Sequence, residues 1–255
     1  MAHVPENDLK TEMLEATATV DLFGIGIVGC SAEGAALCYR TLCAEGAQRL
    51  GAHRHPQISM HTPSLHRYVE CLERGDRVGI ADLMLDSARR LQAAGADFLI
   101  CPDNTIHQAF DLVQAETPLP WLHIAQEVAR EAAARGYRRV GITGTAWLVA
   151  SEVYPQALEA QGLAWLRPSE AERQAMGRII MVELVYGRCQ ADSVATLQAI
   201  ITSLAARGCD AVVLGCTELP LVLNDGNSAL PTLDSTRLLA RAALDQAIAR
   251  TLPGG

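Results

Sequence analysis

Two stretches of this chain end an apolar run in a side chain that can exchange protons. GADFLICPDNTIHQ begins at Gly95, and GCDAVVLGCTELPL begins at Gly208. When the two stretches are aligned on these glycines, Asp103 falls opposite Cys216. At neutral pH an aspartate is ionised and a cysteine is protonated, so the pair could supply one base and one acid. Two such groups on opposite faces of one carbon are what an inversion of configuration requires.

Short apolar runs alternate along the chain with longer segments of helical periodicity, which is typical of βαβ units and a parallel sheet. We expect eight strands, two of them weak (from 163 and 230), in runs that start at residues 22, 56, 96, 118, 138, 163, 210 and 230. Asp103 and Cys216 each follow such a run. In open α/β sheets ligands bind at the carboxyl ends of strands, where the next helix offers free amide groups to a carboxylate.

The repeat extends beyond these two stretches. IGIVGCS, from Ile25, aligns with VGITGTA, from Val140, at an offset of 115 residues, compared with 113 for the first pair. This nearly constant register predicts two similar α/β lobes, each with a mainly parallel sheet flanked by helices, and a cleft between them. We place a tail at 1–19, the first lobe at 20–118, the second lobe at 119–234, and a C-terminal helix at 235–255 that packs back on the first lobe.

Composition argues against several cofactor classes. The single lysine, Lys10, lies in the tail, whereas pyridoxal phosphate enzymes and P-loops need a lysine in the site. GIGIVG has the spacing G-x-G-x-x-G, but two of its glycines lie inside the apolar run and no acidic residue ends the next strand, which argues against a nicotinamide cofactor. The histidines from His53 to His66 match no metal-ligand spacing. We therefore expect neither a cofactor nor a metal.

Charge and cysteine usage indicate the setting. The net charge is −8 without a basic block, which argues against nucleic acid and anionic membrane partners. No apolar run reaches the roughly 18 residues of a membrane span. Eight cysteines without a C-x-x-C pair, behind a polar N-terminal segment, predict reduced thiols in a cytoplasm. Apart from Cys216 we interpret them, Cys30 and Cys101 included, as small core side chains.

The motif LGCTELPLVL around Cys216 resembles the second cysteine signature of the aspartate/glutamate racemase superfamily. GIVGCSAEGA, VGITGT, SEVYPQAL, IIMVELVYGR and LDSTRLLARAAL support this resemblance, which covers the chain from about Gly24 to Ala243. Members are two-lobed, pyridoxal-independent enzymes that use one cysteine from each lobe. The resemblance implies an amino-acid racemase that acts at the carbon next to a carboxylate, and a homodimer. It makes Cys216 one catalytic acid/base and implies these substrate-binding residues: Ser31, Asn104, Thr105, Thr143 and Thr217.

The chain departs from the family pattern at the first site. Members read PCNT where this chain reads PDNT, so Asp103 stands in place of the first catalytic cysteine. After one turnover the pair would be a protonated aspartate and a thiolate, which is disfavoured by about 4–5 pK units, or about 6 kcal/mol. Three alternatives therefore stay open. The first is a racemase with Asp103 and Cys216 on opposite faces. The second is a decarboxylase or cis-trans isomerase of a small (di)carboxylic acid that uses Cys216 alone. The third is a non-catalytic protein that binds small acids.

Four further side chains near these motifs have two interpretations each. Glu218 could orient the substrate or raise the basicity of the Cys216 thiol, or it could cap the next helix. His61 follows a strand and could line the cleft, or it could be a solvated loop histidine. His107 lies one turn beyond Asp103, where a role at the cleft edge and a role in catalysis are both open. His123 opens the second lobe and could instead be an interior hydrogen-bonding histidine.

Overall fold

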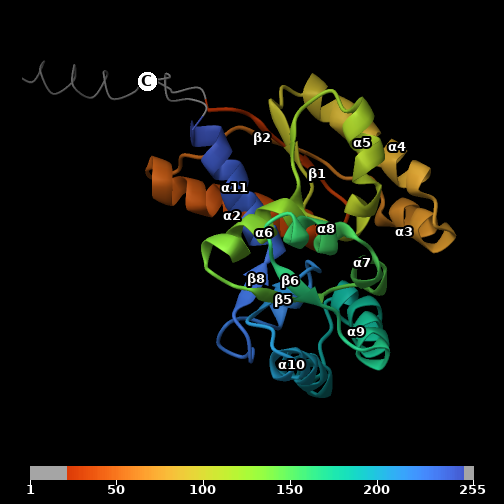
Figure 1. Ribbon diagram of the computed structural model, residues 1–255. Helices are drawn as coiled ribbons and strands as arrows, with labels where there is room; N and C mark the ends of the chain where they lie inside the picture. Colours follow the sequence, from red (N-terminus) through yellow and green to blue (C-terminus); the bar gives the residue numbers. More distant parts are fainter. Residues whose placement is uncertain (1–21, 250–255) are drawn as a thin grey trace, which may run out of the picture.

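The computed structural model describes residues 22–249 of the chain. The predicted tail at residues 1–19 and the last residues of the predicted C-terminal helix lie outside this range. All eight predicted runs contain a strand, and the strands form two four-stranded sheets in which every pair is parallel. Figure 1 shows the two lobes that these sheets define, with β1 and β2 in the upper lobe and β5, β6 and β8 in the lower lobe. The prediction of two α/β lobes is confirmed.

The two sheets have the same strand order. The first sheet has the order β2-β1-β3-β4, with β1 at Ile25–Val28, β2 at Ile58–His61, β3 at Phe98–Ile100 and β4 at Trp121–Leu122. The second has the order β6-β5-β7-β8, with β5 at Arg139–Thr143, β6 at Ala164–Leu166, β7 at Ala211–Leu214 and β8 at Thr232–Asp234.

The strand register follows the sequence repeat. Gly26 pairs with Leu99 in the first sheet, and Gly141 pairs with Val212 in the second. Gly141 lies 115 residues after Gly26, and Val212 lies 113 residues after Leu99, which are the two offsets found in the sequence. The carboxyl ends of β3 and β7, which precede Asp103 and Cys216, therefore hold equivalent places in the two lobes.

The two aspartates that the repeat aligns have the same local role. Oδ2 of Asp97 accepts a hydrogen bond from the amide of Gly24 at 2.6 Å. The carboxylate of Asp210 accepts from the amides of Arg138, at 2.8 Å, and Arg139, at 3.0 Å. Each aspartate thus ties the start of its strand to the chain that enters the neighbouring strand, which fixes the register of the sheet at that end.

Helices cover both faces of each sheet. Those of the first lobe are α2 (Ala32–Leu50), α3 (Leu65–Arg74), α4 (Arg77–Ala93), the 3-10 helix η1 (Thr105–Ala109) and α5 (Phe110–Glu116). Those that follow are α6 (Ile124–Ala134), α7 (Ala146–Ala150), α8 (Val153–Glu159), α9 (Glu170–Val182), η2 (Leu184–Tyr186), α10 (Ala191–Ala206), η3 (Leu219–Leu221) and α11 (Ser235–Ala249). None of the helices between residues 22 and 249 combines the length and apolar character needed to cross a membrane.

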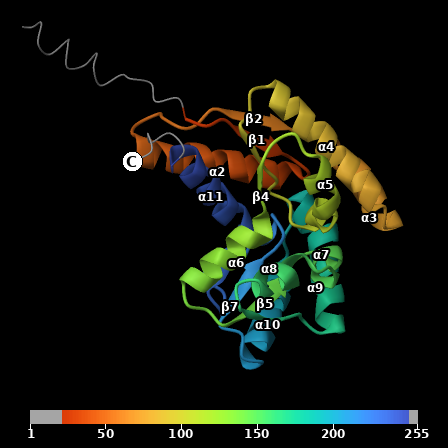
Figure 2. The ribbon, with the colours of Figure 1, turned by 45° about the horizontal axis from the view of Figure 1, so that its top comes forward.

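Alternation along β1 explains the two helical layers of the first lobe. Ile25 and Ile27 belong to an apolar cluster with side chains of α2 and α11, whereas Val28 belongs to a cluster with side chains of α3 and α4. Successive strand residues point to opposite faces, so one apolar run serves both layers. Figure 2 shows α2 and α11 on one side of β1 and the α3–α4 pair on the other.

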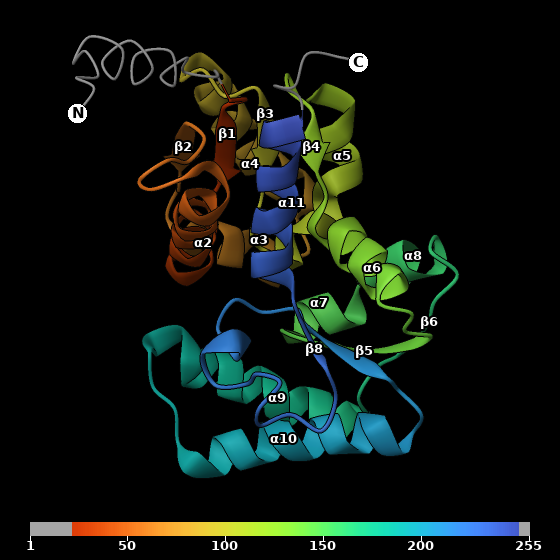
Figure 3. The same cartoon turned by 90° about the vertical axis from the view of Figure 1, so that its left-hand side faces the viewer.

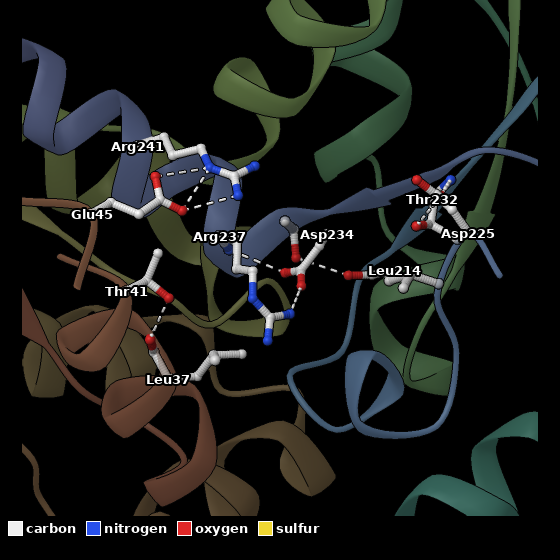
Figure 4. Close-up of polar contacts among 10 residues, drawn as sticks. Leu37, Thr41, Glu45, Leu214, Asp225, Thr232, Asp234, Arg237 and Arg241 are labelled. Atoms are coloured by element: carbon white, nitrogen blue, oxygen red, sulfur yellow. Dashed lines mark hydrogen bonds and ion pairs between the residues drawn. The ribbon is translucent and has the colours of Figure 1, made fainter. Parts of the chain in front are cut away.

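The C-terminal helix returns to the first lobe. Leu239, Ala243 and Leu244 of α11 are buried in the cluster that contains Ile25 of β1 and Leu42 of α2. Figure 3 shows α11 between α2 and α6. An ion pair between Arg241 and Glu45, at 2.9 Å, ties α11 to α2 at the edge of this cluster (Figure 4).

The predicted boundary between the lobes is wrong by a few residues. We placed the strand that begins near Pro118 in the second lobe, but β4 pairs with β3, with Leu99 opposite Trp121. The first sheet therefore extends to Leu122. An apolar run identifies a strand, but the sheet that it joins depends on contacts with residues far away in the sequence.

Candidate active site

A small pocket lies between the two lobes at the carboxyl ends of β1, β3 and β7. Its volume is about 60 Å³, and Cys30, Asp103, Cys216 and Glu218 are among the residues that line it. Two larger hollows, of about 680 and 800 Å³, lie elsewhere on the part of the chain that the structure describes, and neither is lined by a cysteine. The proton-exchanging groups of the two lobes thus meet in one place.

Asp103 has a thiol neighbour that the sequence analysis assigned to the core. Ile27 pairs with Ile100, and Cys30 and Asp103 each lie three residues beyond this pair. The Cys30 thiol lies next to the Asp103 carboxyl group, close enough for each group to shift the pKa of the other. Burial raises the pKa of Asp103 above its usual range, while the hydrogen bond from the Ile106 amide, at 3.1 Å, and the neighbouring Cys30 thiol counteract this shift. The aspartate thus holds its proton more tightly than a free aspartate does.

The sequence carried a signal for Cys30 that we did not use. The repeat aligns Gly29 with Gly144, so Cys30 corresponds to Thr145, and both residues follow the glycine at the end of a strand. Both line the pocket. Burial raises the pKa of the Cys30 thiol well above its usual range, and the Asp103 carboxylate raises it further.

Cys216 is bonded to the carboxylate next to it. Its Sγ donates to Oε2 of Glu218 at 2.8 Å, and the Thr217 hydroxyl donates to the same oxygen at 2.7 Å. Burial, and then the charge of Glu218, raise the pKa of Cys216 well above its usual range. Glu218 makes no capping hydrogen bond to η3, so the capping interpretation is wrong. The thiol is protonated in this arrangement, and Glu218 accepts its hydrogen bond.

Two hydroxyl pairs close the pocket across the lobes. Ser31 lies 3.2 Å from Thr217, and Thr105 lies 2.9 Å from Thr145, oxygen to oxygen. A volume of about 60 Å³ holds about two water molecules, whereas pockets for small ligands have about 300 Å³ or more. The pocket is therefore too small for an amino acid while these hydroxyl pairs are in contact.

Asn104 connects the lobes as well as lining the pocket. Its Oδ1 accepts from the Tyr154 hydroxyl at 2.6 Å, and its Nδ2 donates to Oγ of Ser235 at 3.0 Å. Ser235 in turn donates to the carbonyl of Leu214 at 2.9 Å, which places it against the end of β7. The amide thus fixes the loop after Asp103 relative to Cys216.

Thr143 is not brought to the pocket. Its hydroxyl donates to the carbonyl of Val213 in β7 at 2.5 Å, and it is not among the pocket-lining residues. Thr145, two residues further along, lines the pocket and caps α7. The motif VGITGT contains both threonines. Only the structure shows that the hydroxyl of Thr143 is bonded within the sheet and that Thr145 is the one that lines the pocket.

The three histidines lie around the pocket without lining it. Nδ1 of His61 is 2.9 Å from the Ser87 hydroxyl on α4. Nδ1 of His107 donates to the carbonyl of Asp103 at 2.6 Å, so His107 supports the Asp103 loop from behind. The rings of His107 and His123 meet edge to face with centroids 4.5 Å apart. Burial lowers the pKa of both, that of His123 to about 4.

This histidine pair predicts acid sensitivity. His123 has a pKa of about 4 when folded and 6.5 when free, so the unfolded chain binds one more proton between these values. Stability is therefore complete above pH 6.5 and lost as the pH falls to 4, by about 3 kcal/mol for this group. Nδ1 of His123 has no hydrogen-bond partner, so His123→Phe removes the proton site without breaking a bond there. We expect the free energy of unfolding in urea to fall less between pH 7 and pH 4 for His123→Phe than for the wild type.

The control is His66→Phe, since His66 is exposed on α3 and pairs only with Glu70. It should lose stability on acidification as the wild type does. An equal fall in the free energy of unfolding for the wild type and His123→Phe would show that His123 is not the group that makes the fold sensitive to acid.

The comparison with known families decides what kind of protein this is. The family model for Asp/Glu/Hydantoin racemase matches residues 25–243. The chain belongs to this family. The family is named for racemases of aspartate, glutamate and hydantoins. No group of three or more His, Cys, Asp or Glu side chains that could hold a metal lies within residues 22–249.

Solved structures of the racemase family share the fold. A Yersinia pestis protein assigned as an Asp/Glu racemase is 29% identical, with a TM-score of 0.82 over 89% of this chain and 100% of that one. An aspartate racemase homologue from Pyrococcus horikoshii OT3 is 27% identical, with a TM-score of 0.76 over 88% and 99%. The two-lobe architecture of this racemase-family protein is therefore shared over most of the chain.

Similar proteins of named activity differ in their substrates. The broad specificity amino-acid racemase RacX of Bacillus subtilis is 26% identical over 166 residues, which is 65% of this chain and 71% of that protein. A glutamate racemase of Thermus thermophilus is 31% identical over 153 residues, which is 58% of this chain and 54% of that protein. Membership in the racemase family thus leaves the substrate of this protein to be derived from its own pocket.

Proposed function

We propose that this protein is a cofactor-independent amino-acid racemase that transfers protons at the carbon next to a carboxylate. The observation that carries the proposal is that Asp103 and Cys216, from equivalent strands of the two lobes, line one pocket. Asp103 takes the proton from one face of the carbon, and the Cys216 thiol donates one to the other face. In the opposite direction the Cys216 thiolate is the base and protonated Asp103 is the acid.

The neighbouring residues support these roles. Glu218 bonds Cys216, and the Ile106 amide bonds Asp103, so both groups are held in position before a substrate binds. The hydroxyls of Ser31, Thr105, Thr145 and Thr217, together with Asn104, bind the substrate carboxylate. The negative charge that develops on this carboxylate in the carbanion is then stabilised by donors already in place.

One observation favours a second candidate. Burial raises the pKa of Asp103 but also raises that of Cys216, so the difference in acidity between the two groups is not removed. Returning the enzyme to its starting form then costs free energy in one direction. A decarboxylase of a small (di)carboxylic acid avoids this cost because carbon dioxide leaves the carbon and Cys216 alone supplies the proton that replaces it. A cis-trans isomerase avoids it because Cys216 alone can add to the double bond and leave again, with no net proton transfer. A non-catalytic acid-binding protein needs neither group.

Proton NMR in D₂O, combined with polarimetry, separates these functions. We expect amino acids to lose the Cα–H signal and their optical rotation with the wild type but not with Cys216→Ala. Exchange with retained configuration would contradict a two-base racemase and indicate a single active base. No exchange with any amino acid, together with turnover of a malonate or a maleate-like diacid, would replace the racemase by the second candidate. Binding of small acids without any turnover would leave only the binding protein.

Two further expectations stay predictions. The resemblance to the family implies a homodimer, which sedimentation of the full chain tests. The reduced state of the eight cysteines implies a cytoplasmic location, which fractionation of the source cells tests.

A further inference from the structure

The pocket has an apolar side that the proposed proton transfer does not use. It is formed by side chains from both lobes, which are Leu65, Val69 and Leu72 of α3, Trp147 of α7, and Ile180 and Met181 of α9. The three α3 residues are spaced i, i+4, i+7, so they lie on one face of that helix. The polar side of the pocket, with its thiols, carboxylates and hydroxyls, lies at the strand ends. The cavity is thus divided into a reactive side and an apolar side.

Two members of this apolar side lie outside the hydrophobic clusters of the lobes. Val69 and Trp147 are partly exposed, and neither belongs to the hydrophobic clusters found within residues 22–249. Leu72 and Met181, in contrast, pack against those clusters. Trp147 and Val69 therefore line the pocket from opposite lobes without packing into either core. A substrate side chain in the pocket would contact both of them.

The charges of the pocket are of one sign. No lysine, arginine or histidine is among the pocket-lining residues of the described chain, while Asp103 and Glu218 are carboxylates. The hydroxyls and Asn104 can serve one substrate carboxylate. A second carboxylate would lie among apolar side chains without a cation, close to two groups of its own charge, and both features disfavour its ionised form.

We propose that the site takes amino acids with an apolar side chain and discriminates against aspartate and glutamate. This inference rests on the proposed racemase function and assigns its substrate class. Trp147 and Val69 are the residues that contact the substrate side chain and determine specificity. The α-carboxylate lies against the inter-lobe hydroxyls, and the side chain extends between α3 and α9.

The test compares initial rates of Cα–H exchange in D₂O for leucine, methionine, aspartate and glutamate with the wild-type chain. Methionine and glutamate are matched in length, so their difference reports the charge. We expect kcat/KM for methionine and leucine to exceed that for glutamate by about 100-fold or more, as expected for a site that leaves a buried charge unpaired. Faster exchange with aspartate or glutamate would overturn the substrate class and leave the racemase proposal standing. No exchange with any of the four would overturn both.

A charge-insertion variant tests the residues that we assign. Val69→Arg should lower kcat/KM for leucine at least about tenfold and raise the glutamate-to-leucine ratio, because it adds a cation to the apolar side. The matched control is Val78→Arg, since Val78 of α4 is 63% exposed and does not line the pocket. It should leave both rates unchanged. A Val69→Arg variant that folds, as judged by circular dichroism, and keeps the wild-type ratio would overturn the assignment of this surface.

Discussion

Replacing Cys216 with alanine should lower kcat by about 10³-fold or more, because the reaction loses its acid/base on the second-lobe face. The thiol is the group at the end of β7 that faces the pocket, and its hydrogen bond to Glu218 holds it there. Ser31 and Thr217 remain, so binding of a small acid should change much less than kcat. Exchange rates in D₂O and a binding isotherm for the same acid measure the two effects separately.

The matched control for this variant is Cys209→Ala. Cys209 is as buried as Cys216 and precedes β7, at the end of the strand away from the pocket. Both substitutions remove one buried sulfur and should cost similar, modest stability of about 1 kcal/mol. Only Cys216→Ala should lose activity. If Cys216→Ala kept its rate within tenfold of the wild type, Cys216 would not be an acid/base, and the racemase proposal would fail with it.

The fold could be predicted from the sequence because two properties of the chain repeat. Apolar runs marked all eight strands, and the offsets of 115 and 113 residues indicated that the strands that carry the site hold matching places in the two halves. The sheet that β4 joins could not be predicted, since a run of apolar residues before Trp121 suits either lobe. That choice is made by the pairing of Leu99 with Trp121.

The site could be predicted only in part. The aligned strand ends identified Asp103 and Cys216, but side-chain direction decided between Thr143, which bonds to β7, and Thr145, which lines the pocket. Cys30 was assigned to the core because its contact with Asp103 depends on the two strands lying side by side. The apolar side of the pocket combines α3 with α9, about 100 residues apart in the sequence, so no local pattern reveals it.

The second large effect concerns Asp103. Asp103→Asn should lower racemisation by about 10²–10⁴-fold, because the amide cannot take the proton. It keeps an oxygen that can accept from the Ile106 amide, so the loop should keep its shape. Exchange of one enantiomer through Cys216 alone should survive, with retained configuration. NMR and polarimetry on each pure enantiomer test this, and full racemisation by Asp103→Asn would remove Asp103 from the mechanism.

Asp103→Cys separates the role of the carboxylate from that of the position. A thiol there would match Cys216 and remove the difference of about 4–5 pK units between the two groups, so the rates from the two enantiomers should become more equal.

As a base, Asp103 must be ionised, so the wild-type kcat/KM with Asp103 as base should fall as the pH drops through its raised pKa. In Asp103→Cys the same fall should occur at higher pH, because a thiol ionises later than a carboxyl group. An unchanged profile would mean that Asp103 does not carry the transferred proton. The Cys30 thiol, which lines the pocket beside Asp103, would then be the first-lobe group to replace next.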